Sequence, residues 1–150
     1  MTQDAFRSAR FVGVPIDLYL EMQMHNDAVG RDLMLAIEEG TVPDIAARVR
    51  GLLGEGYERL IDAREAMRAQ VEAARSSGQT HVDLTSSYLV EDVATALDYF
   101  ALVEEADALA TRGIIFVPDP GPEVARFRRW MMDEMDAQVM GGRPPTPFAG

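Results

Sequence analysis

The chain has 150 residues, of which 47% are hydrophobic and 26% are charged, and its formal net charge is −11. This length and composition predict one globular domain with a single good core. A charge this negative leaves no basic face for phosphates, so we expect no nucleic-acid partner.

Two residue types are missing, and each absence excludes a class of chemistry. The sequence contains no cysteine, which excludes disulfides, thiolate nucleophiles and cysteine-ligated metals. It contains no lysine, which excludes a Walker A phosphate loop and Schiff-base catalysis. No apolar run reaches the ~18 residues of a membrane span, and the N-terminus lacks the apolar run of a secretory signal. We therefore expect a cytoplasmic protein without membrane contact.

The first predicted helix covers residues 15–39. Pro15 suits a first-turn position, and Gly40 suits a C-terminal stop. One face of this helix is apolar except for a histidine, because three- and four-residue steps connect Leu18, Met22, His25, Val29, Leu33 and Ala36.

The second predicted helix covers residues 41–76, with Thr41 as its cap and Asp44 near its N-terminus. Gly54 and Gly56 each cost about 1 kcal/mol relative to alanine, so we expect a kink near them. Gly56 lies on the apolar stripe, where it could instead permit a close helix crossing. The polar residues 76–87 are predicted to form a loop.

The remaining predicted helices cover residues 89–112 and 122–140. The proline-rich connection between them is short and extended, and the tail "GGRPPTPFAG" cannot be helical. Residues 11–14 and 114–117 could pair as a two-stranded ribbon. We predict an all-α, up-and-down four-helix bundle within a single domain, 1–150, in which 1–10 and 141–150 form flexible or extended tails.

His25, in the stretch "EMQMHND", is the first candidate for a site. It could be a hydrogen-bonded core residue, a contact for a ligand or partner, or a metal ligand. The core reading is favoured, because the chain lacks the Glu-x-x-His repeat of carboxylate-bridged metal bundles. We expect His25 to be buried, free of metal, and hydrogen-bonded to another helix or to Glu21. Asn26 and Asp27 are expected to point away from it.

The fourth helix supplies the other candidates. Arg126, Arg128 and Arg129 are spread around a helix by the ~100° step per residue, which favours a solvated face over a phosphate site. Met132 and Trp130 could leave an apolar patch for a partner helix, although core packing is the favoured reading. The candidate interaction or structural polar residues are Glu21, His25, Asn26, Arg128, Arg129, Trp130 and Met132.

Two segments, residues 12–36 and 124–148, resemble a helical regulatory domain of actinobacterial signalling proteins. The resemblance is carried by "HND" at 25–27, "FRRW" at 127–130 and the proline-rich tail at 144–147. Such domains occur with ATP-binding anti-sigma kinases, SpoIIE-type phosphatases and STAS-domain antagonists. The resemblance implies partner-switching signalling, with an anti-sigma kinase or a STAS-type regulator as partner. This chain does not match the kinase itself. The kinase motif needs a histidine downstream of its asparagine, and Gly30 stands four residues after Asn26 instead. The glycine-rich loops of the kinase are also missing.

The sequence therefore predicts a regulatory, protein-interacting module that is not an enzyme and needs no cofactor. The alternative is a sensor bundle that binds a small molecule or a metal near His25. Homodimer formation is left open.

Overall fold

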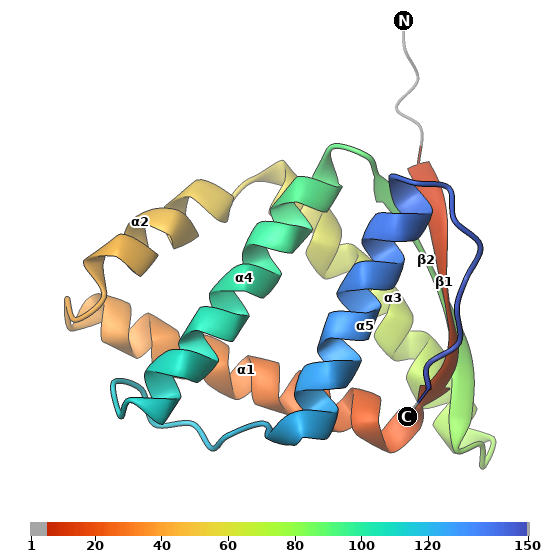
Figure 1. The fold of residues 1–150 in the computed structure, drawn as a ribbon, viewed down its shortest axis with the longest axis horizontal. Coiled ribbons are helices and arrows are strands. Elements are labelled where there is room, and N and C mark those ends of the chain that lie inside the picture. The colour runs from red at the N-terminus through yellow and green to blue at the C-terminus, as the bar shows by residue number, and fades with distance from the viewer. Residues whose placement is uncertain (1–5, 150) are drawn as a thin grey trace, which may run out of the picture.

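Residues 6–149, which the computed structural model describes, form five helices and one two-stranded antiparallel sheet (Figure 1). The elements in chain order are β1 (Phe6–Pro15), α1 (Ile16–Glu38), α2 (Pro43–Leu52), α3 (Glu55–Ser76), β2 (His81–Leu89), α4 (Asp92–Thr111) and α5 (Gly121–Val139). The prediction of a mostly helical fold is confirmed, whereas the up-and-down four-helix arrangement is not. Within the described residues, no helix combines the length and the apolar character that a membrane crossing requires.

The sheet differs from the predicted ribbon in its second strand. β1 pairs with β2, most of which lies in the segment 76–87 predicted as a loop, and residues 114–117 form no strand. Leu84, Ser86 and Tyr88 are buried and alternate with exposed residues, which is the period of a strand with one covered face. This segment is rich in serine and threonine, a composition that is typical of a turn. The alternation of buried and exposed residues is therefore not visible as an alternation of apolar and polar residue types in the sequence.

The second predicted helix is divided into α2 and α3. The break falls at Gly54, so the predicted kink is a complete interruption between Leu52 and Glu55. Gly56 then allows α3 to approach α4 closely, because a Cβ atom there would lie 3.0 Å from Oδ1 of Asp92. Arg59 joins the same contact by donating to both carboxylate oxygens of Asp92, at 2.6 and 2.8 Å.

In the tertiary arrangement α4 and α5 cross α1, with the sheet at one end of the molecule and α2 at the other (Figure 1). The larger apolar core lies against the sheet and contains Phe11, Tyr19 and Phe127. A second core, which includes Val29 and Leu102, fills the space between α1, α2 and α4. α1 contributes to both cores, and His25 lies in α1 between the parts that serve each one.

The C-terminal segment is extended and packs along β1 (Figure 1). The backbone N–H of Phe148 donates to the carbonyl of Val12 at 3.0 Å. The centroid of the Phe148 ring lies 5.1 Å from the ring centroid of Phe127 and 5.2 Å from that of Trp130. Trp130 Nε1 donates to the carbonyl of Thr146 at 3.2 Å. The tail therefore covers the edge of the sheet with an aromatic anchor.

Candidate functional site

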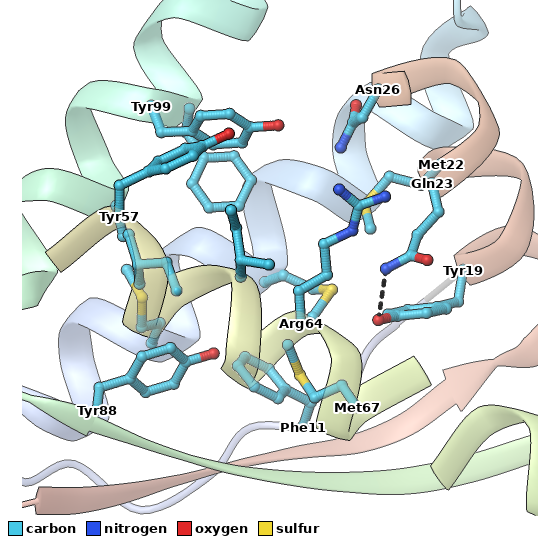
Figure 2. Close-up of a pocket in the computed structure, with 16 residues that line it drawn as sticks. Phe11, Tyr19, Met22, Gln23, Asn26, Tyr57, Arg64, Met67, Tyr88 and Tyr99 are labelled. Carbon is cyan, nitrogen blue, oxygen red and sulfur yellow. Dashed lines mark hydrogen bonds between the residues drawn. The ribbon is translucent and has the colours of Figure 1, made fainter. Parts of the chain in front are cut away.

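A cavity of about 130 Å³ lies between the helices and the inner face of the sheet (Figure 2). All four tyrosines of the chain line it, namely Tyr19 from α1, Tyr57 from α3, Tyr88 from β2 and Tyr99 from α4. Four of the nine methionines also line it: Met22, Met67, Met131 and Met135. The cavity therefore has an aromatic and thioether lining that comes from every helix and strand except α2.

Local structure explains how these side chains meet. Phe11 on β1 and Tyr88 on β2 are buried and point to the covered side of the sheet. Tyr19 and Met22 are three residues apart on α1 and share the helix face that packs against the sheet. Tyr57 and Tyr99 face each other across α3 and α4, with ring centroids 6.2 Å apart.

Polar groups gather at one end of the cavity. Figure 2 shows the guanidinium of Arg64 and the side-chain amide of Asn26 close to Gln23 at this end. One hydrogen bond joins the lining residues to one another, from Gln23 Nε2 to the hydroxyl of Tyr19 at 2.8 Å (Figure 2). The hydroxyls of Tyr57, Tyr88 and Tyr99 thus form no hydrogen bond with another lining residue.

An ion pair connects α3 to α1 beside this polar end. Arg64 Nη2 donates to Oδ1 of Asp27 at 2.5 Å, and each of the two side chains is 38% exposed. Burial lowers the pKa of Arg64, but the hydrogen bond and the charge of Asp27 outweigh that effect and leave the pKa raised. Arg64 is therefore positively charged and already neutralised by a partner that reaches solvent.

The tyrosine hydroxyls stay protonated. Burial raises the pKa of Tyr19, Tyr88 and Tyr99 above the ordinary tyrosine value, because a phenolate would lose its hydration inside the protein. At neutral pH the cavity consequently presents neutral phenols, which both donate and accept hydrogen bonds.

His25 lies in a polar network between three helices, and this network meets the cavity at Asn26. Its side chain is 9% exposed, and Nε2 lies 2.7 Å from Oδ1 of Asp107 on α4. Arg128 of α5 donates to the other oxygen of Asp107 at 2.5 Å and to Oδ1 of Asn26 at 3.2 Å. The hydrogen bond of His25 to another helix agrees with our expectation, and its partner is Asp107 instead of Glu21, which is exposed.

The structure corrects one expectation for the predicted site residues. Arg128 is 3% exposed and pairs with Asp107, so the prediction of a solvated face was wrong for this residue. Arg128 also donates to Asn26, which lines the cavity, whereas His25 does not line it. The physical reason for the burial of Arg128 is its ion pair with Asp107, whose side chain is 16% exposed.

The other candidates of the fourth helix lie apart from His25. Arg129 is exposed and donates to Glu104 at 2.6 Å. Trp130 packs against Phe127, Phe11 and the tail residue Phe148. Met132 is 6% exposed, which agrees with the favoured reading of core packing, and the alternative, an exposed patch of Trp130 and Met132, does not form.

Sequence reasoning missed Asp107 and Arg64 although both carry a recognisable signal. Asp107 stands four residues after Val103 and so continues the apolar stripe of the third predicted helix. Arg64 stands four residues after Leu60 and three before Met67 on the stripe of the second. A charged residue on an apolar stripe indicates a buried partner from another helix.

The described part of the chain contains no group of three or more His, Cys, Asp or Glu side chains placed to hold a metal ion. Comparison of this chain with protein-family models, with curated proteins and with solved structures found no match.

Proposed function

We propose that this protein is a non-catalytic regulatory module that binds a small, largely apolar molecule in the tyrosine-lined cavity and passes this signal to a protein partner. The cavity is the observation that carries the proposal. His25 is not among its lining residues, so the proposed ligand site differs from a sensor centred on His25.

The apolar lining of the cavity supports a ligand. Two lining residues, Ile61 and Arg64, reach the surface, so the space is not sealed from solvent. A ligand that fills the space would remove apolar lining surface from water, which favours the bound state by about 25 cal/mol per Å².

The position of the cavity suits a regulatory role. Its walls include Met22 of α1, Met67 of α3, Ala96 of α4 and Met131 of α5, so one ligand would contact four helices at once. A ligand that binds one helix arrangement better than another shifts the protein toward it.

A protein partner is supported by the surface and by the resemblance of residues 12–36 and 124–148 to helical regulatory domains of signalling proteins. The side chains of Met24 and Phe116 are apolar and are 73% and 87% exposed. We propose that the protein acts in bacterial partner-switching signalling in the cytoplasm, with an anti-sigma kinase or a STAS-type regulator as its partner.

Native mass spectrometry of protein purified from its host tests the ligand. The variant Ala96→Leu adds a bulky side chain to the cavity wall, whereas Ala94→Leu adds the same side chain at an exposed position of the same helix. We expect wild type and Ala94→Leu to carry a bound small molecule and Ala96→Leu to lack it. Equal occupancy in all three proteins, or none in wild type, would contradict the proposal.

A further inference from the structure

We propose that the ligand of this cavity is an uncharged molecule with one aromatic ring and one hydrogen-bond acceptor substituent. The inference rests on the proposed function, because it takes the cavity as a ligand site. It adds the chemical class of the ligand from the size, lining and polarity of the site.

The volume suits a ligand of about one ring. A cavity of ~150 Å³ lined by apolar side chains holds a single benzene molecule. The cavity here, at about 130 Å³, is close to that size. A small substituent on such a ring could extend toward the exposed pair of Arg64 and Asp27.

The lining favours an aromatic ring over an aliphatic chain. Tyr57, Tyr99 and Phe100 form a tilted cluster, with neighbouring ring centroids 6.2 and 6.0 Å apart. A ligand ring inserted beside such a cluster gains edge-to-face contacts that an alicyclic ring cannot make. The four lining methionines add sulfur–aromatic contacts.

The polar end requires an acceptor. The Arg64 guanidinium and the Asn26 amide lie at the same end of the cavity in Figure 2, and the oxygen of Asn26 already accepts from Arg128. Its amide nitrogen and the Arg64 nitrogens are donors, so a carbonyl or hydroxyl oxygen of a ligand is the complementary group. With the ring of the ligand in the apolar part of the cavity, the oxygen of its substituent would lie at the polar end, near these donors.

The electrostatics favour a neutral acceptor over a carboxylate. Asp27 neutralises Arg64, and the whole chain carries a net charge of −11. Burial raises the pKa of Tyr19, Tyr88 and Tyr99, which shows that the space disfavours negative charge. A buried carboxylate would lose its hydration here, and Arg64, the cation that lines the cavity, is already paired with Asp27.

Isothermal titration of the full chain with four matched probes tests the class. Benzamide has the ring and the neutral acceptor, benzene lacks the acceptor, benzoate is charged, and cyclohexanecarboxamide lacks the aromatic ring. We expect benzamide to bind most tightly, with each of the other three weaker by about threefold or more, since one such interaction contributes about 0.5–1.5 kcal/mol. Arg64→Met should remove the preference of benzamide over benzene, while Arg75→Met, at an exposed position of the same helix, should keep it.

Three results would overturn the chemical class. Tighter binding of benzoate or of cyclohexanecarboxamide than of benzamide would do so while leaving a ligand-binding cavity in place. Failure of all four probes, with a host molecule still bound to wild type and absent from Ala96→Leu, would also reject the class and keep the proposed function. Failure of the probes together with an empty host protein would reject both.

Discussion

Arg128 Nη2 lies 2.5 Å from Oδ2 of Asp107, and the Arg128 side chain is 3% exposed. The other oxygen of Asp107 contacts His25, so one carboxylate connects α1, α4 and α5. A buried guanidinium is stable only if it keeps such a partner, because its hydration is lost on folding.

Removal of this carboxylate should destabilise the protein strongly. Asp107→Ala leaves Arg128 buried without a counter-charge, which costs about 3–5 kcal/mol in the free energy of unfolding. Urea denaturation measures the loss, with Asp98→Ala as the control, because Asp98 is exposed on the same helix. Equal losses for the two variants would contradict a structural role for the ion pair.

Substitution of His25 should have a smaller effect that depends on its hydrogen bond. His25→Ala removes the contact with Asp107 and should cost about 1–3 kcal/mol, whereas His25→Gln can donate to the same oxygen and should lose less. Thermal denaturation of the three proteins checks this order. Wild-type stability of the alanine variant, combined with loss of ligand or partner binding, would instead place His25 in a functional site.

Phe148 should anchor the tail. Phe148→Ala removes the ring that packs on Phe127 and Trp130 and should lower the free energy of unfolding by about 1–2 kcal/mol, since the ring is only partly buried. Trp130 is the single tryptophan, so its fluorescence should shift to longer wavelength when the ring is lost. Phe116→Ala is the control, because that ring is 87% exposed, and an equal effect of the two variants would contradict the anchor.

The buried tyrosines should make the fold sensitive to alkali. Their pKa values are raised in the folded state, while an unfolded tyrosine ionises near pH 10. Above about pH 10 the unfolded chain therefore loses protons first, and each tyrosine lowers stability by up to about 1.4 kcal/mol per pH unit until its folded form also ionises. Below about pH 10 the tyrosines are protonated in both the folded and the unfolded chain, so they cause no loss of stability there.

Urea denaturation between pH 8 and pH 11 measures this slope. Tyr88→Phe and Tyr99→Phe should each make the decline less steep, because the phenylalanine cannot ionise in either state. An unchanged slope in both variants would mean that these hydroxyls ionise equally in the folded and unfolded chains.

α1, α4 and α5 were predictable because each carries a long apolar stripe, and they begin and end near the expected residues. β2 was not predictable from composition, because Thr85, Ser86 and Ser87 suggest a turn while the antiparallel pairing with β1 holds them extended. The same pairing changes the arrangement of the helices, since α3 and α5 must cover one face of the sheet.

For the candidate site, the sequence predicted which side of its own helix a residue occupies. It did not predict which residues of different helices contact one another. The stripe placed His25 in the interior, but nothing in the sequence near it identified Asp107, which is 82 residues away. The four tyrosines occur singly on four different elements, so only the tertiary fold brings them to one cavity. Single polar residues on apolar stripes remain the sequence feature that marks such contacts.

The most direct test of ligand binding in the cavity is a ¹³C-methyl NMR titration of the methionines with benzamide. Met22, Met67, Met131 and Met135 line the cavity, whereas Met24, Met34 and Met140 are exposed and serve as internal controls. We expect the four cavity methyl signals to shift in a saturable way while the three exposed signals stay in place, because a bound ring changes the magnetic environment only of its neighbours. Unchanged signals at all seven methionines, or shifts confined to Met24, Met34 and Met140, would contradict ligand binding in the cavity.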